Sequence, residues 1–537
     1  LTMAGRATLI KSTLNNLPNH IMQYIHIPAS IIKKMDKYQR NFLWGTTTTR
    51  KKLHLFKWRT VTQPIEMGGL GIQTLQQKNA ALLGSLAWRA FHSHQILWAK
   101  VLINKYSTLR STSNYSNIWR NIMRGWKSCQ LGVQWQVGTG EHIKFWDDTW
   151  LGPGLTVRSL ISGPIPNSHL NSYISSIYNG NIWNWTNLPF QFPKNLKMNI
   201  EATYISEYNR KADHIFWALT NHGKFTVNSL YKALQNQSNN IHGVTTQFKW
   251  IWNLPIHPKI KYFIWLLNHN RLLTPQYLNH LGITANAHCF YCHNGDESLN
   301  HLFFACKNAH TFWNTLGMGN YINSLLRYST PQEWLIPLLS YTGNKFPYNV
   351  NRRTYLPLCL WNIWLTRNKN MYEGRQDQIN KSFITKQATE YCYLVAPSHK
   401  IKNNIRVPLK WIPPAPNIYK LNTDAAHSTH STRNGIGGII RDHRGNWILG
   451  FAGTVLSKEA NVTEILALLQ GLRCAVQHNL TPLNVEIDAK EVIRLLTNNN
   501  ILHANLLSDC RHLLKQLHDP TVSHAYREQN RLADKLA

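Results

Sequence analysis

Four acidic residues near the C-terminus lie at positions from which their side chains could meet. Asp424 ends an apolar, strand-like stretch (YKLNTD) and Asp488 ends a second one (LNVEID). Glu464 and Asp534 lie in the helix-like stretches TEILALLQGL and NRLADKLA. Carboxylates gathered at one point repel each other, so we expect such a group to require divalent cations. Two cations about 3.5–4 Å apart activate water and stabilise the leaving oxygen in phosphodiester cleavage, and hard oxygen ligands favour Mg²⁺ or Mn²⁺. The alternative for any single acid is a solvated surface position.

The elements that would position these acids follow one another in a regular order after residue 418. The patterns predict three strands, a helix, a strand, a helix, a strand and a final helix, with a hairpin turn at 443–446. This order predicts an α/β domain with a mixed five-stranded sheet. In such a sheet, acids at the ends of strands would project from one edge.

A second chemical pattern lies near the middle of the sequence. Cys289, Cys292, His301 and Cys306 follow the spacing C-x2-C-x8-H-x4-C. Four thiolate and imidazole ligands match the tetrahedral coordination of a structural Zn²⁺, and no position remains open for catalysis. Chance spacing of core cysteines is the alternative. The other five cysteines are interpreted as ordinary buried residues: Cys129, Cys359, Cys392, Cys474 and Cys510.

The charge is strongly positive and unevenly distributed. The 537 residues contain 58 Lys and Arg and 25 Asp and Glu, for a net charge of +33. Residues 418–537 hold 13 of these basic and 11 of these acidic residues, which leaves 45 and 14 for residues 1–417. An excess of this size favours a nucleic-acid partner, because basic side chains that neutralise phosphates release counterions. A membrane surface is less favoured, since no basic amphipathic helix stands out. The oligomeric state stays open.

The sequence also bears on the compartment. No apolar run approaches the roughly 20 residues that span a bilayer, and no secretory signal peptide is recognisable. The eight cysteines do not form a disulfide framework. We therefore expect an intracellular location, in the nucleus or the cytoplasm.

Composition and pattern suggest a multidomain chain with mainly helical N-terminal and zinc-binding regions before the α/β domain. A stretch with five prolines, APSHKIKNNIRVPLKWIPPAPN, reads as an extended linker. The predicted segments are a helical region (1–110), a connecting region with hairpins (111–245), a zinc-binding region (246–320), a helical segment (321–395), the linker (396–417) and the α/β domain (418–537).

The acidic motifs LNTD, TEILALLQGL, VEIDAKEV and HAYREQNRLADKLA resemble those of type 1 ribonuclease H domains, in the version that ends plant LINE-type (non-LTR) retrotransposon polyproteins. The resemblance implies a two-metal hydrolase that cuts the RNA strand of RNA–DNA hybrids. It places metal-binding carboxylates at Asp424, Glu464, Asp488 and Asp534. It also implies that His524 assists proton transfer or product release. Two features depart from the family. Ala425 stands where glycine is usual, and the sequence ends at Ala537 inside the last helix.

The resemblance extends upstream. WNLPIHPKIKYFIWLL and the cysteine cluster with HLFFAC are similar to the zinc-binding region of the same polyproteins, and LTMAGRATLIKSTLNNLP, FLWG and GGLGI are similar to a thumb-like segment that follows the polymerase core. The pair Asp147-Asp148 superficially matches the paired aspartates of a polymerase. No fingers or palm sequence precedes this pair, so we expect no reverse transcriptase activity from this chain.

Three functions follow as hypotheses. The first is an RNA–DNA hybrid ribonuclease on a retroelement-derived, nucleic-acid-binding scaffold. The second is a catalytically inactive nucleic-acid-binding protein of the same origin, which Ala425 and the absent polymerase core would favour. The third is a structural zinc-module protein that does not bind nucleic acid.

Overall fold

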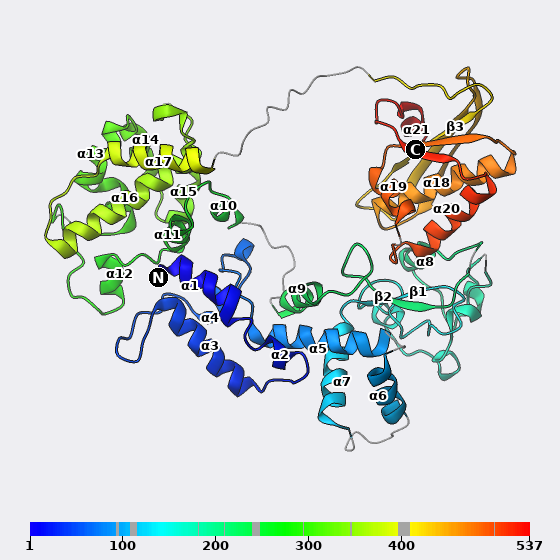
Figure 1. Ribbon diagram of the computed structural model, residues 1–537, viewed down its shortest axis with the longest axis horizontal. Coiled ribbons are helices and arrows are strands. Elements are labelled where there is room, and N and C mark those ends of the chain that lie inside the picture. The colour runs from blue at the N-terminus through cyan, green and yellow to red at the C-terminus, as the bar shows by residue number, and fades with distance from the viewer. Residues whose placement is uncertain are drawn as a thin grey trace. The chain divides into compact units, whose positions relative to one another are not determined.

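The computed structural model describes residues 1–92, 96–107, 115–180, 182–208, 210–238, 248–293, 295–343, 346–395, 409–498 and 500–537. It contains two units, and each is assembled from separated parts of the chain (Figure 1). The first unit comprises Leu1–His20, Ile27–Lys78 and Ile241–Asn403, and the second comprises Ile21–His26, Asn79–Asn240 and Asn404–Ala537. The sequence suggested consecutive segments, because patterns along a chain do not report contacts between residues hundreds of positions apart.

The described residues of the first unit form helices joined by loops and turns. Its helices are α1 (Met3–Leu9), α3 (Ala29–Trp44), α4 (Trp58–Val61), α10 (Lys249–Trp252), α11 (Pro258–Asn268), α12 (Pro275–His280), α13 (Lys307–Thr315), α14 (Gly319–Leu325), α15 (Pro331–Leu339), α16 (Arg352–Glu373) and α17 (Lys381–Val395). Among the described residues of the whole chain, no helix is long and apolar enough to cross a membrane.

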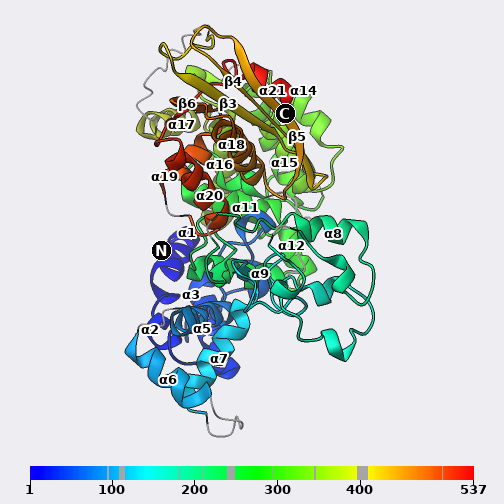
Figure 2. The same cartoon turned by 90° about the vertical axis from the view of Figure 1, so that its right-hand side faces the viewer.

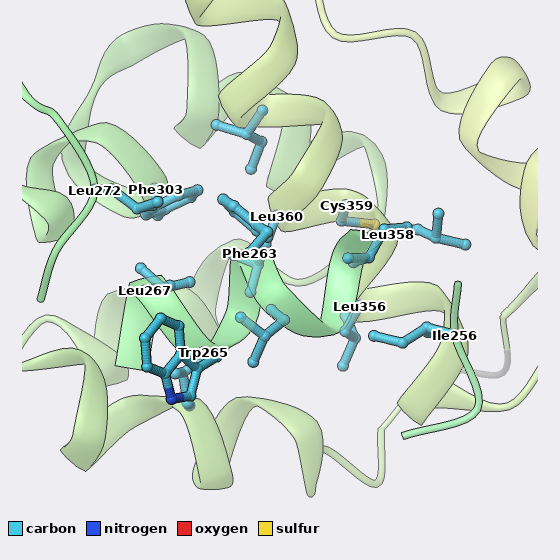
Figure 3. Close-up of a cluster of buried hydrophobic side chains, with 14 of the residues drawn as sticks. Ile256, Phe263, Trp265, Leu267, Leu272, Phe303, Leu356, Leu358, Cys359 and Leu360 are labelled. Atoms are coloured by element: carbon cyan, nitrogen blue, oxygen red, sulfur yellow. The ribbon is translucent and has the colours of Figure 1, made fainter. Parts of the chain in front are cut away.

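Helix α11 lies at the centre of the core of this unit. Pro258 occupies its first turn and the His257 side chain accepts a hydrogen bond from the Lys259 N–H, which together define where the helix begins. Its apolar residues, among them Phe263 and Trp265, pack with residues of α16 such as Leu360 (Figure 3). The helix is apolar on nearly all sides because the surrounding helices bury it.

The N-terminal part of the second unit holds a small two-stranded sheet. Its helices are α6 (Leu97–Ser107), α7 (Asn117–Cys129), α8 (Lys194–Glu201) and α9 (Val227–Ser238); α5 (Leu75–His92) and α2 (Asn19–Met22) cross the boundaries between units. The strands β1 (Val133–Gln136) and β2 (His214–Trp217) pair with each other, antiparallel. The two predicted local hairpins each supply one strand to this long-range pair. Each piece also forms a backbone hydrogen bond within itself, from the Trp135 N–H to the Thr149 carbonyl at 2.8 Å and from the Trp217 N–H to the Gly223 carbonyl at 3.0 Å. Turn residues predicted a change of direction in each piece but not the partner strand.

The C-terminal part of the second unit contains the predicted mixed five-stranded sheet, in the order β5-β4-β3-β6-β7. The strands β3, β4 and β5 pair antiparallel, and β3-β6 and β6-β7 pair parallel. The predicted fold class is therefore confirmed. The elements are β3 (Tyr419–Ala426), β4 (Arg433–Arg441), β5 (Trp447–Leu456), α18 (Ala460–Gln477), β6 (Leu483–Ile487), α19 (Lys490–Thr497), α20 (Ala504–Gln516), β7 (Thr521–His524) and α21 (Arg531–Leu536). The sequence interpretation lacked α20.

Helices cover both faces of this sheet. Helix α18 packs so closely on β3 that a Cβ at Gly471 would lie 2.9 Å from the side chains of Leu421 and Thr423. On the other face, a Cβ at Gly437 would lie 2.4 Å from the backbone of Ala537, at the end of α21. Because side chains alternate along a strand, α18 and α21 lie on opposite faces. Figure 2 shows α18 beside the strand β3.

Helix α20 attaches the connecting region to the C-terminal sheet domain. Its Asp509 is fully buried and accepts hydrogen bonds from the Tyr204 hydroxyl at 2.7 Å, the Ser206 hydroxyl at 2.6 Å and the Glu207 N–H at 2.9 Å. The Asn505 amide donates to the Val137 carbonyl at 2.7 Å. A buried carboxylate needs such donors to offset its desolvation. The two regions therefore form one packed body.

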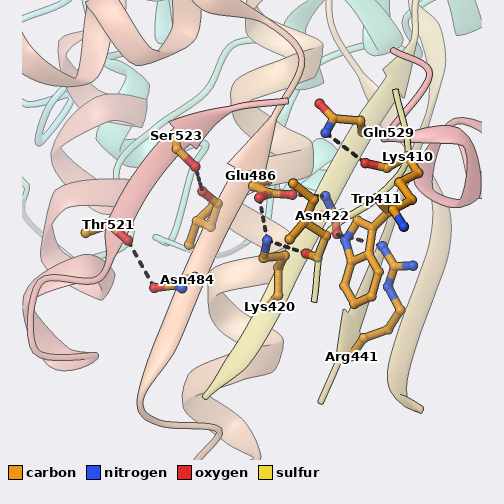
Figure 4. Close-up of polar contacts among 12 residues, drawn as sticks. Lys410, Trp411, Lys420, Asn422, Arg441, Asn484, Glu486, Thr521, Ser523 and Gln529 are labelled. Atoms are coloured by element: carbon orange, nitrogen blue, oxygen red, sulfur yellow. Dashed lines mark hydrogen bonds and ion pairs between the residues drawn. The ribbon is translucent and has the colours of Figure 1, made fainter. Parts of the chain in front are cut away.

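The end of the predicted linker lies on the sheet, while residues 396–408 are outside the described residues. Trp411 Nε1 donates to the Asn422 side-chain oxygen on β3 at 3.0 Å. The Arg441 guanidinium of β4 lies 3.5 Å from the centroid of the Trp411 ring. Gln529 Nε2 donates to the Lys410 carbonyl at 3.0 Å (Figure 4). We call residues 409–412 the strap, since they bind both the sheet and the segment that precedes α21.

Candidate active site and metal centre

Two of the four acids are brought together by parallel strand pairing. Thr423 of β3 pairs with Ile487 of β6. Each of these two residues is followed along the chain by an aspartate: Asp424 on β3 and Asp488 directly after β6. Because parallel strands end at the same edge of a sheet, the two carboxylates become neighbours. Asp424 is buried and Asp488 is half-buried.

The third acid comes from α18. The first turn of this helix is fixed by buried Thr463, whose hydroxyl lies 2.7 Å from the Ser457 hydroxyl and donates to the Glu459 carbonyl at 3.1 Å. Glu464 follows Thr463 and reaches the two aspartates. Ligand oxygens of Asp424, Glu464 and Asp488 all lie within 4.8 Å of one another. This spacing allows one cation to contact all three.

Asp534 lies beside this group without joining it. Asn530 Nδ2 donates to the Thr423 carbonyl at 2.9 Å, which fixes the start of α21 next to Asp424. Gly437, the β4 partner of Asp424, has no side chain to hold α21 away from the sheet. A hydrogen bond between the Asp424 and Asp534 carboxyl groups is among the contributions that raise the pKa of Asp424. Asp534 also lies 3.8 Å from the exposed Arg527 guanidinium.

Burial and mutual repulsion raise the pKa values of two of the acids, Asp424 and Glu464. Burial and the neighbouring charges of Asp488 and Asp534 raise the pKa of Asp424 to about 7. Burial, with the charges of Asp424 and Asp488, raises the pKa of Glu464 to about 8. Both carboxyl groups hold protons that ordinary surface acids have lost at neutral pH. The donor set consists only of carboxylate oxygens and fits Mg²⁺ or Mn²⁺.

His524 and Ala425 occupy neighbouring positions on the sheet. His524 ends β7 and pairs with Ile487, the residue before Asp488. Its ring lies edge-on to Tyr526, with centroids 5.0 Å apart. Ala425 continues β3 in regular pairing with Ile436 of β4, so the strand accommodates it without a turn that would require glycine.

The four predicted zinc ligands also meet. Ligand atoms of Cys289, Cys292, His301 and Cys306 lie within 4.8 Å of one another. Cys289 Sγ lies 3.8 Å from Cys306 Sγ, and Cys292 Sγ lies 3.3 Å from His301 Nε2. His301 begins a single π-helical turn that ends at Ala305, and the turn buries Leu302, Phe303 and Phe304 in the core. The buried apolar residues between His301 and Cys306 thus fix the positions of these two ligands.

The pKa shifts within the sulfur group go in both directions. The hydrogen bond with Cys306 lowers the pKa of the Cys289 thiol and raises that of Cys306. The hydrogen bond with Cys289 raises the pKa of His301. One thiolate is therefore readily available, as zinc binding requires.

A buried ion pair connects the segment between Cys292 and His301 to α16. Arg367 of α16 is 1% exposed and Glu297 is 0% exposed. Arg367 Nε donates to Glu297 Oε1 at 2.8 Å, and Nη2 lies 2.6 Å from the same oxygen. Burial raises the pKa of Glu297, and Arg367 opposes this shift. The pair connects the segment between the Cys292 and His301 ligands to a helix far along the chain.

Asp147 and Asp148 are engaged in local structure. Asp147 forms an ion pair with Arg158 at 2.6 Å, and Asp148 accepts the Lys144 N–H at 2.7 Å. Their side chains bind different partners within one aromatic-rich segment.

The sequence did not single out several residues that support these sites. Asp509 lies in a helix that the sequence analysis did not predict, and no pattern in the sequence indicated that Glu297 is buried. Trp411 was assigned to a linker. The buried pair had no local signal in the sequence, because Arg367 lies in the polar run TRNKN that follows the apolar stretch of α16.

The geometry defines a protein with a carboxylate centre on a mixed α/β sheet and a separate cysteine–histidine centre. Comparison with known proteins agrees with this division. Residues 422–537 match a family model described as reverse transcriptase-like, and residues 225–313 match one described as zinc-binding in reverse transcriptase. These matches confirm the resemblance to reverse transcriptase polyproteins at both centres.

Two proteins of Arabidopsis thaliana are similar in sequence. One, provisionally named a ribonuclease H protein, is 27% identical over 563 residues, which cover 100% of this chain and 89% of that protein. The other, an uncharacterized mitochondrial protein, is 28% identical over 142 residues, which cover 25% of this chain and 92% of that protein.

Solved structures align with about a fifth of the chain. Ribonuclease H1 from the archaeon Halobacterium salinarum is 22% identical, with a TM-score of 0.22, over 22% of this chain and 94% of that chain. LC11 ribonuclease H1 in complex with an RNA/DNA hybrid is 20% identical, with a TM-score of 0.21, over 22% of this chain and 92% of that chain.

Proposed function

We propose that this protein hydrolyses the RNA strand of RNA–DNA hybrids by a two-metal mechanism. The observation that carries the proposal is the convergence of Asp424, Glu464 and Asp488 from β3, α18 and β6 within 4.8 Å. The name of the Arabidopsis relative, a ribonuclease H protein, supports the same reaction.

The residues have separate roles in this proposal. Asp424, Glu464 and Asp488 would hold the divalent cations, and Asp534 would join them when it exchanges Arg527 for a cation. Bound Mg²⁺ or Mn²⁺ supplies the charge that lowers the pKa of an attacking water and stabilises the leaving oxygen. His524, at the rim of the same sheet edge, would accept or donate a proton as the product strand leaves.

The basic part of the chain would hold the substrate. The net charge of +33 favours a polyanion, and the excess lies outside residues 418–537. The two units interleave along the sequence. Cutting the chain at the predicted linker would divide the second unit. The contribution of the basic residues to nucleic-acid binding should therefore be measured on the full chain.

The cysteine–histidine centre would hold one structural Zn²⁺. Three sulfurs and one imidazole nitrogen fill a tetrahedral coordination shell. The family match of residues 225–313 supports this ion. The role proposed for it is to fold the loop between residues 289 and 306.

The test is cleavage of a labelled RNA strand paired with DNA by the full chain, with Mg²⁺ or Mn²⁺ and with a chelator. We expect cleavage with either metal, none with the chelator, and none of RNA or DNA duplexes. A folded protein that binds the hybrid and cuts nothing would establish the inactive nucleic-acid-binding alternative. A protein that binds no hybrid at any salt concentration would support the third hypothesis, a structural zinc-module protein that does not bind nucleic acid.

A further inference from the structure

An exposed aromatic residue stands beside the carboxylate centre on a fixed turn. Tyr526 is 51% exposed and follows β7. The Gln529 N–H donates to the Tyr526 carbonyl at 2.8 Å, and the Tyr526 N–H donates to Gln529 Oε1 at 3.1 Å. The Gln529 amide also donates to Lys410 of the strap (Figure 4). The turn is thus held by hydrogen bonds within itself and by the bond to the strap, while the Tyr526 side chain stays exposed to solvent.

One cationic side chain lies over this ring, and a second cationic residue follows Tyr526 in the sequence. Lys490 Nζ lies 5.7 Å from the centroid of the Tyr526 ring. The Arg527 side chain is 78% exposed and approaches Asp534 at 3.8 Å. The His524 ring is nearly perpendicular to that of Tyr526, with centroids 5.0 Å apart. An exposed tyrosine with cationic neighbours contributes little to a core, and it has the composition of a surface that binds nucleic acid.

The position of these residues relates them to the acids. Lys490 is the first residue of α19 and follows Asp488 by two positions, and Arg527 contacts Asp534. Positive charges therefore lie next to two of the carboxylates. A strand whose phosphate reached the acids would bring its adjoining phosphates to these cations.

We propose that Tyr526, Lys490 and Arg527 form a subsite for the nucleic-acid strand next to the carboxylate centre. Lys490 and Arg527 contact backbone phosphates, and the Tyr526 ring stacks on a base or a ribose. This inference rests on the proposed function and adds the residues that position the strand. The strap and Gln529 keep the subsite in place.

The experiment uses the full chain carrying Asp488→Asn, so that binding of a fluorescent RNA–DNA hybrid is measured without cleavage. Tyr526→Ala should weaken binding about 5- to 150-fold, and Tyr526→Phe should bind like the parent, because stacking needs the ring and not the hydroxyl. Lys490→Met and Arg527→Met should each reduce the slope of log Kd against log salt by about 1.

Lys515→Met, on the exposed surface of α20, is the matched control and should leave affinity unchanged. Unchanged affinity and salt slope in all subsite variants would overturn the inference, as would equal losses for Lys515→Met and Lys490→Met. If Tyr526→Ala fails to fold, the salt slopes of the two exposed cation variants decide. Absence of cleavage by the unmutated chain would instead count against the proposed function, since binding is scored separately.

Discussion

The two candidate metal centres differ in how the chain assembles them. The cysteine–histidine ligands all lie between residues 289 and 306, around one turn and one π-helical turn. The acids lie between residues 424 and 534 on strands and helices that meet only in the folded sheet domain. A ligand group that is local in sequence can form with its metal, whereas a dispersed group has to wait for the fold.

The two centres also differ in their charge balance. Thiols and imidazole can share protons through hydrogen bonds, and this lowers the pKa of Cys289. In the acidic group, burial and then the charges of the neighbouring carboxylates raise the pKa values of Asp424 and Glu464 to about 7 and about 8. We infer that the first centre depends on its metal for folding and the second for chemistry.

The largest effect should come from the zinc ligands. We expect about one zinc per chain, lost in Cys292→Ser together with order in residues 285–310, because structural zinc contributes about 10–16 kcal/mol of binding free energy in small modules. Elemental analysis and hydrogen exchange would measure both. Cys392→Ser, at a half-buried cysteine outside the cluster, should keep its zinc. No metal in protein purified without chelator would contradict the assignment.

Next in size, Asp488→Asn should abolish metal-dependent cleavage. Asparagine keeps the shape of the side chain and removes the charge that holds a cation, so the fold should persist and hybrid binding should stay equal or become tighter as repulsion of phosphate falls. Cleavage rate and hybrid affinity are the two measurements. Cleavage at the wild-type rate would show that the metal-site assignment is wrong.

His524→Ala provides the internal contrast at the same sheet edge. A proton shuttle contributes about 10²–10⁴-fold, so turnover should slow without disappearing. A loss as complete as that of Asp488→Asn would place His524 among the essential ligands instead.

The buried ion pair tests how local the zinc centre is. Arg367→Met leaves Glu297 without a partner and should destabilise the protein by about 3–5 kcal/mol, while the double variant Arg367→Met, Glu297→Leu should recover much of this loss. Urea unfolding followed in the presence of zinc would measure both. Equal stability of the single and double variants would show that the pair does not couple the loop to α16.

The smallest effect concerns pH. The pKa of Asp424 in the folded protein, about 7, exceeds its ordinary value of 3.8, so the folded state binds this proton more tightly than the unfolded state. Its contribution to stability is complete below about pH 4 and is lost as pH rises through 7. With chelator present, Asp424→Asn should therefore stabilise the protein by about 1–3 kcal/mol at pH 8, and this gain should vanish near pH 4. A gain that is the same at both pH values would contradict this origin.

Several features of the fold were predictable because their signals are local. The hairpin turn of β4 and β5 contains Gly445 in the left-handed conformation, and the motif of alternating residues around it identified both strands. Apolar runs marked the part of β3 that leads to Asp424 and the strand β6 that precedes Asp488. The helix α20 was missed because its stretch carries His503, Asp509 and other polar residues that are buried against the connecting region rather than exposed.

By itself, the sequence determined the spacing of the cysteine–histidine cluster and the order of the five strands along the chain of the sheet domain, because each depends on residues close together or on a repeated side-chain pattern. Tertiary structure alone decided which atoms meet. Parallel pairing of β3 and β6 brought Asp424 to Asp488. The close approach of α21 over Gly437 brought Asp534 to Asp424. Likewise Asp509, Trp411 and Arg367 acquired partners far away in the chain. Such contacts depend on packing in three dimensions, which leaves no period in the sequence to read.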